Sequence, residues 1–347
     1  MSTADFLLIR PVNVTPAMLT SCTVPESTQP EYVTGTTYAA DALVGVSAGT
    51  AQAIYRSLQG ANTGNAPASS PTWWQFLGTV YAAWSGATTY ALGAIVSDLA
   101  THQLYESLAA GNLNNPVTTT AKWVPLGATN RWKQFDKVVN SQTVAPGSIS
   151  QTISAGTLIN TLVGLNVDGN VATLTQSQSG YTQTRNLVQH EVNNWYDFFY
   201  EEPIRTGDVA FTDIPPYPGS TLTLTITNPG GNVAIGCCFV GKARLLGQTK
   251  WDLTGGVLSY SSRFEDQFGN VTLIKRNKAK RLNFEVYIEP GFESEAYRLL
   301  DEYTDVEVVV IGSKRHSMTF AYGFLGQWSV PVTNSYKPAT IEFKGLT

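Results

Sequence analysis

The stretch TLTLTIT, residues 221–227, alternates threonine with leucine or isoleucine at a period of two. This alternation is typical of a β-strand with one buried face. A second strand is expected at 233–240, and the residues NPGGN at 228–232 join the two as a turn. Upstream, apolar segments predict strands at 149–153, 161–167 and 171–175, the last two joined as a hairpin by Asp168-Gly169-Asn170. Residues 129–250 are therefore predicted to form a jelly-roll-like β-sandwich.

The segments on either side of this sandwich have different patterns. Residues 292–303 place Phe292, Ala296, Leu299, Leu300 and Tyr303 on one helical face. Strands are expected around this helix at 257–265, 270–276, 282–288, 305–311, 316–322 and 339–343. Residues 251–347 are thus predicted to form an α+β domain. Residues 1–30 are predicted to be an anchor and linker, with a strand at Phe6–Ile9 and a linker at Pro25–Pro30.

Residues 31–79 and 80–128 are two copies of one aromatic-rich pattern. The matched residues are Tyr55-Arg56-Ser57-Leu58 with Tyr105-Glu106-Ser107-Leu108, Asn65 and Pro67 with Asn114 and Pro116, and Trp74, Leu77 and Gly78 with Trp123, Leu126 and Gly127. The spacing places a one-residue insertion or deletion between the tyrosine and the asparagine. Each copy is near the lower size limit of a domain, so its aromatic rings must supply most of its core. The overall prediction is a mainly β chain.

The composition excludes several classes of function. Charged residues make up 14% of the chain, against roughly 25% in an average soluble domain. The net charge of −4 argues against a general nucleic-acid binder, which needs a broad basic surface. The sequence has no run of roughly 18 apolar residues, so no membrane span is expected. The first residues lack the pattern of a secretory signal, so synthesis in the cytoplasm is expected. The three cysteines, Cys22, Cys237 and Cys238, are expected to be small buried residues rather than a disulfide framework.

Residues suited to catalysis are few. Glu201, Glu202, Asp208 and Asp213 lie close in sequence, near Tyr196, Tyr200 and Tyr217, but neighbours in sequence do not create the carboxylate pair that a glycosidase needs. His102, His190 and His316 are scattered, and no nucleophile elbow, phosphate loop or zinc spacing occurs. We therefore expect no enzyme activity, no catalytic residue, no metal site and no cofactor.

The aromatic residues of the repeats suggest sugar binding, because flat rings stack on the apolar face of a pyranose. The candidates are Tyr55, Trp73, Trp74, Tyr105 and Trp123. For the four at shared positions, a place in the core is the simpler interpretation. Trp73 is different, because the second copy has Lys122 at this position. Adjacent residues on a strand face opposite ways, so one of Trp73 and Trp74 is expected to be exposed.

The repeat pattern, Tyr…Gly…Val…Leu-Tyr…Pro…Trp-x-x-Leu-Gly, resembles carbohydrate-binding modules of the chitin-binding type 5/12 class over residues 32–127. Such modules occur in chitinases and as tandem copies in phage tail proteins. The segment Gly127–Asp136 is similar to the junction that precedes a β-sandwich in phage tail and baseplate proteins. This resemblance implies glycan contact by Trp73, Trp74 and Trp123.

The expected function is that of a structural protein of a bacteriophage tail tip or baseplate, located in the virion. Expected partners are other tail or baseplate proteins, further copies of the chain in a homo-oligomer, and host surface polysaccharide or lipopolysaccharide during adsorption. One alternative is a purely architectural virion protein in which the repeats are spacers. Another is a secreted polysaccharide-degrading enzyme with accessory modules. The basic run 275–281 is expected to be a hairpin with a solvated turn.

Overall fold

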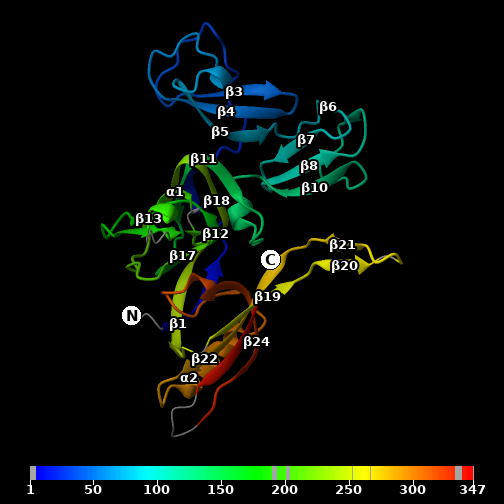
Figure 1. Cartoon of the computed structure of the whole chain (residues 1–347). Coiled ribbons are helices and arrows are strands. Elements are labelled where there is room, and N and C mark those ends of the chain that lie inside the picture. Colours follow the sequence, from blue (N-terminus) through cyan, green and yellow to red (C-terminus); the bar gives the residue numbers. More distant parts are fainter. Residues whose placement is uncertain are drawn as a thin grey trace.

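The computed structural model describes residues 5–189, 194–200, 204–251, 253–265, 267–332 and 338–346. The fold is mainly β, as predicted. Figure 1 shows two small modules at one end of the molecule, a β-sandwich-like region in the middle and the C-terminal strands at the other end. No helix within the described ranges has the length and apolar character needed to cross a membrane.

Both repeats fold into a three-stranded antiparallel sheet with the same strand order. Module 1 is formed by β3 (Leu43–Ala48), β4 (Ala51–Ser57) and β5 (Trp74–Tyr81). Module 2 is formed by β7 (Ile95–Asp98), β8 (Gln103–Ser107) and β10 (Trp123–Ala128), with a small ribbon of β6 (Thr89–Tyr90) and β9 (Asn112–Leu113).

The middle region is organised around one long strand, β18 (Thr221–Thr249). The first part of β18 pairs with β13 (Val171–Gln176) and its second part with β12 (Thr161–Asp168). On its other edge both parts pair with β11 (Thr143–Ser154). Side chains from both parts of β18 meet in one core, which includes Ile149, Leu174, Phe211, Ile226 and Val240. The layers of the sandwich thus share strands that bend between them.

Two turn predictions in this region are wrong. Residues 228–232 do not separate two strands, because β18 continues through them and they form a bulge opposite Pro146 and Ser148 of β11. Asp168-Gly169-Asn170 does not close a hairpin, because β12 and β13 lie end to end along β18 instead of pairing with each other.

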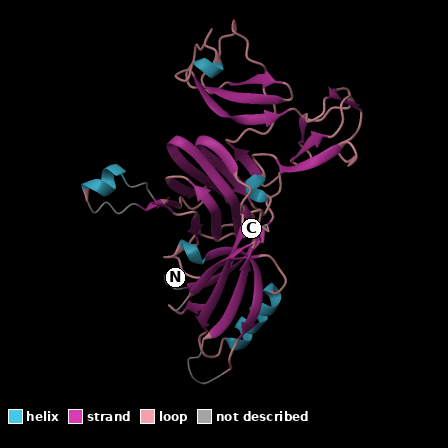
Figure 2. Ribbon diagram, turned by 45° about the vertical axis from the view of Figure 1, so that its right-hand side comes forward, coloured by secondary structure: helices cyan, strands magenta, loops and turns pink. Residues whose placement is uncertain are grey.

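Further strands complete the region: β2 (Leu19–Cys22), β14 (Thr182–Asn186), β15 (Val188–Gln189), β16 (Ile204–Arg205) and β17 (Asp208–Phe211). The short helix α1 (Trp195–Tyr200) lies between β15 and β16 and projects from the body (Figure 2).

The last part of β18 enters a ring of six antiparallel strands. The order is β18, β1 (Asp5–Val12), β23 (Val308–Ile311), β24 (Phe320–Ser329), β25 (Ala339–Gly345) and β22 (Lys278–Tyr287). The pairing of β22 with Gln248 and Thr249 of β18 closes the ring. Helix α2 (Glu293–Tyr303) packs Ala296, Leu300 and Tyr303 into the core of this ring.

The sandwich-like region and the six-stranded ring together form the body of the molecule, and the N-terminal strand joins two of its three cores. The strand predicted at Phe6–Ile9 is confirmed as part of β1. Phe6 and Leu8 point into the core beside α2, whereas Leu7 and Ile9 contact a second core formed with β12 and β18. Because both faces of β1 are buried, this segment is an integral strand of the body.

The helix and the basic run differ in detail from expectation. Helix α2 is confirmed, but Phe292 precedes it and is exposed. The strand expected at 257–265 is broken into β19 (Thr254–Ser259) and β20 (Ser262–Glu265), and β21 (Val271–Ile274) returns toward β22. The basic run 275–281 lies midway along this long hairpin and not at its turn, because β20 and β21 extend the hairpin beyond it.

Candidate binding surface of the repeat modules

Each module is built around one buried tryptophan. The indole nitrogen Nε1 of Trp74 donates a hydrogen bond to the carbonyl oxygen of Asn65 at 2.9 Å, and Nε1 of Trp123 donates to the carbonyl of Asn115 at 2.9 Å. The two side chains are 2% and 1% exposed. A ring with no open face cannot stack on a sugar, so Trp74 and Trp123 are core residues and are corrected as glycan candidates.

A chain of asparagine side chains supports each tryptophan. Nδ2 of Asn65 donates to Oδ1 of Asn62 at 2.9 Å, and Nδ2 of Asn115 donates to Oδ1 of Asn112 at 2.8 Å. The equivalent of Asn65 is therefore Asn115, and the predicted match with Asn114 is wrong by one residue. Asn114 instead has a positive φ of 54°, in the left-handed region that asparagine tolerates. The length difference between the copies lies after this asparagine and before the tryptophan.

A tyrosine completes the frame in both copies. Tyr38 and Tyr90 each meet the tryptophan ring of their module edge-on, with ring centroids 5.3 Å apart in both. Their hydroxyl oxygens accept a hydrogen bond from the backbone N–H of Val33 and Ser85, each at 2.8 Å. The duplicated contacts show that the repeat encodes one packing unit made of tryptophan, asparagine and tyrosine.

The open aromatic face of module 1 is formed by Tyr55 and Phe76. They lie opposite each other on β4 and β5, so their side chains are on one face of the sheet. The ring centroids are 5.5 Å apart and Phe76 is 40% exposed. In module 2, Tyr105 lies opposite Pro125 and packs partly against the core cluster of Trp123. An aromatic pair of this kind is therefore a property of module 1.

Sequence reasoning missed Phe76, although a signal for it was present. Side chains two residues apart on a strand share a face, so Phe76 shares a face with Trp74. The second copy has Pro125 at the position of Phe76, so the duplicated pattern does not include this residue. Trp73, which was predicted, precedes β5 and is half-buried, and its carbonyl accepts a hydrogen bond from the N–H of Leu58 at 2.9 Å.

The other face of the module 1 sheet turns toward the body. Arg56 donates a hydrogen bond to Gln75, and these residues alternate with Tyr55 and Phe76 along β4 and β5. Gln75 lies close to Gly147 of β11. The polar pair thus faces the sandwich, and the aromatic pair faces away from it.

Module 2 is tied to the body by one carboxylate, Glu26. Its oxygens accept hydrogen bonds from Thr129 Oγ1 at 2.9 Å and Trp132 Nε1 at 3.1 Å, and one lies 2.7 Å from Nδ1 of His102. The guanidinium of Arg131 lies 3.6 Å away. His102 also stacks on Trp132 with ring centroids 4.2 Å apart. The predicted linker at Pro25–Pro30 therefore contains the residue that joins module 2 to the chain after it.

The carboxylates considered for catalysis are not brought together among the described residues. Asp208 accepts hydrogen bonds from the N–H of Asn166 and from Lys280, and Asp213 accepts one from the hydroxyl of Tyr181 at 2.9 Å. Tyr196, Tyr200 and Tyr217 are exposed. The remaining members of that prediction, Glu201 and Glu202, and also His190, lie outside the described residues. Where placement is described, no group of three or more His, Cys, Asp or Glu side chains could hold a metal ion.

No protein-family model matches the sequence, and no curated protein sequence matches it.

Proposed function

We propose that this chain is a multi-copy structural component of a phage tail tip or baseplate, and that module 1 contacts a glycan on the host surface. The observation that carries the proposal is the separation of two regions along the molecule. The modules lie at one end, and the body with its three cores lies beyond them (Figure 1). Such a division suits a protein that is fixed in an assembly by its body and displays small domains from it.

The glycan contact is assigned to Tyr55 and Phe76. Two rings on one sheet face offer a stacking surface for a pyranose, and this face points away from the sandwich. Trp73 is retained as a third candidate because it is partly open. A single platform of this size binds weakly, but several copies in one tail would multiply the binding to a repeating polymer.

The purely architectural interpretation is a second candidate, favoured by one observation. Four shared aromatic residues, Tyr38, Tyr90, Trp74 and Trp123, pack within the modules. The duplicated pattern is thus explained by folding alone. On this alternative the modules are rigid spacers, and Tyr55 and Phe76 contact a neighbouring tail protein.

Retention of the full chain by immobilised host lipopolysaccharide and by chitin oligosaccharides separates the two candidates. We expect Phe76→Ala to weaken retention on one of these matrices by about fivefold to tenfold, which corresponds to about 1 kcal/mol for a lost stacking contact. Leu113→Ala is the matched control, because Leu113 is an exposed apolar residue of module 2. Equal retention of both variants and the parent chain would favour the spacer.

A further inference from the structure

One edge of β18 is left open between its two partners on that side. β12 pairs with β18 as far as Gly241, and β22 pairs with it from Gln248 onward. Over residues 242–247 no described strand pairs with this edge, while β1 occupies the opposite edge. The side chain of Asn160 bonds the N–H and the C=O of Ala243 there, so the open backbone groups lie within residues 244–247. An open edge presents backbone N–H and C=O groups to which another strand can add.

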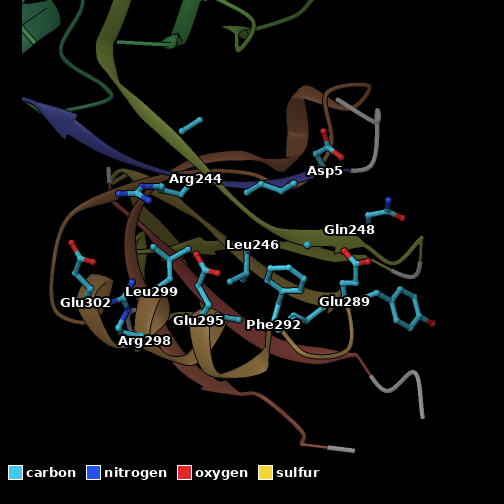
Figure 3. Close-up of a pocket in the computed structure, with 16 residues that line it drawn as sticks. Asp5, Arg244, Leu246, Gln248, Glu289, Phe292, Glu295, Arg298, Leu299 and Glu302 are labelled. Carbon is cyan, nitrogen blue, oxygen red and sulfur yellow. The ribbon is translucent and has the colours of Figure 1, made fainter. Parts of the chain in front are cut away.

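A groove of about 740 Å³ runs along this open edge, between β18 and α2 (Figure 3). Its floor and walls contain apolar side chains, and those of Leu245 and Phe292 are more than half exposed. In Figure 3 the carboxylates of Glu289 and Glu295 lie on either side of Leu246 and Phe292. The groove therefore combines an apolar floor, an acidic rim and a strand edge.

The charge of the groove selects for a cationic occupant. Its lining includes the carboxylates of Asp5, Glu289, Glu295 and Glu302 and two guanidinium groups, those of Arg244 and Arg298. Asp5 is 4% exposed, and its Oδ2 accepts no hydrogen bond within the described chain; the ammonium of Lys314 lies 3.8 Å away. A buried carboxylate oxygen with spare capacity is stabilised by an added donor.

The hairpin formed by β20 and β21, here called the arm, has the opposite character. Ser262 pairs with Ile274 and Phe264 with Thr272 on one face, while Arg263 pairs with Leu273 and Glu265 with Val271 on the other. Phe264, Val271, Leu273 and Ile274 are all exposed, so each face carries two exposed apolar residues. An isolated two-stranded ribbon of this kind is only marginally stable in water, and its apolar residues indicate contact with another surface.

The complementary charge is concentrated at the base of the arm. Lys275, Arg276 and Lys278 follow directly after β21, at the base of the arm, while the arm itself contains Arg263, Glu265 and Asp266. The arm projects from the body on the side away from α2, so it points away from the groove of its own chain (Figure 1).

We propose that the arm of one copy adds to the open edge of β18 in the groove of a second copy. This inference rests on the multi-copy assembly in the proposed function, and it names the two surfaces that form the contact. Because arm and groove are different surfaces, the contact is heterologous, and repetition of it builds a ring or an open filament. The apolar residues of the arm cover Leu245 and Phe292, and Arg263 and the cations at the base of the arm approach the acidic rim.

Disulfide trapping between two variants of the full chain tests the contact directly. Phe264→Cys and Leu245→Cys are purified separately, mixed and oxidised mildly. We expect a dimer that contains one copy of each variant, identified by mass. Leu92→Cys replaces the groove variant as the control, since Leu92 is an exposed module residue. A mixed dimer with the control at the same yield, or none with Leu245→Cys, would overturn the proposal.

The charge complementarity is tested by the molar mass of the chain in solution. Arg263→Glu and Glu295→Arg are each expected to weaken self-association by about tenfold or more, and the two variants mixed together should recover it. A parent chain that stays monomeric at its highest attainable concentration contradicts the inference. Loss of lipopolysaccharide or chitin retention with association intact contradicts only the glycan contact, so the two failures are distinguishable.

Discussion

At the scale of single residues, the buried tryptophans decide whether the modules fold. Trp123→Phe removes the hydrogen bond to the carbonyl of Asn115 and part of the ring that Tyr90 contacts. We expect module 2 to lose about 2–4 kcal/mol of unfolding free energy, from the lost volume and the unpaired carbonyl. Native-state hydrogen exchange of the β8 and β10 amides measures this loss. The control Leu92→Ala changes an exposed side chain and should stay within about 0.5 kcal/mol of the parent chain.

The ion pair of Lys137 and Glu307 makes the stability of the fold depend on pH. The ammonium of Lys137 lies 2.6 Å from Oε2 of Glu307 and holds the pKa of that carboxyl below its usual value. A lowered pKa in the folded state means that the pair stabilises the fold above the pKa of the unfolded carboxyl. This contribution is lost as the pH falls through the folded pKa. Urea unfolding between pH 7 and pH 3 should show a steeper loss of stability for the parent chain than for Glu307→Gln. Parallel curves for the two chains would show that the pair contributes nothing.

At the scale of elements, the long strand β18 separates two adjacent cysteines. Cys238 faces the sandwich core, and Cys237 faces the core shared with β1 and β23. Burial raises the pKa of both thiols, that of Cys238 to about 12. We expect iodoacetamide to modify Cys22 first, because it lies half-buried on the short strand β2, and to reach Cys237 and Cys238 only on unfolding. Early modification of either buried thiol, mapped by peptide mass, would show that β18 opens locally.

The same strand shows how far elements can be predicted from the sequence. Period-two alternation predicts the strand at 221–227, and helical spacing predicts α2, because both signals are local. The partners of β18 are distant in sequence and give no local signal. The hairpin predicted at 168–170 is wrong because β12 and β13 each pair with β18, which overrides the local turn signal. In the candidate site, the repeat identified Trp74 and Trp123 but not Phe76, which one copy alone carries. The groove beside β18 was not predictable, since it is created by a gap between two non-local pairings.

At the scale of the whole molecule, the placement of module 2 depends on Glu26. This carboxylate lies between His102 of module 2 and the segment 129–132 that leads into the sandwich. The amide N–H of Thr129 also donates to the carbonyl of His102 at 2.8 Å. We expect module 2 to stay folded when the buried contacts of Glu26 are broken, while its orientation relative to the sandwich becomes free.

Glu26→Gln tests this arrangement, because it removes the charge and keeps the size of the side chain. His102 and Arg131 lose their anionic partner, and we expect the contact to weaken by about 2–3 kcal/mol. Hydrogen exchange at the Thr129 amide should accelerate, and small-angle X-ray scattering should show a larger radius of gyration, while the β8 amides stay protected. Asp98→Asn is the matched control, because the carboxylate of Asp98 bonds to its near neighbours in sequence, the N–H of Ala100 and the hydroxyl of Thr101. If both variants scatter like the parent chain, module 2 is held by its wider packing and not by Glu26. If the β8 amides lose protection as well, the contacts of Glu26 are needed for module 2 itself to fold.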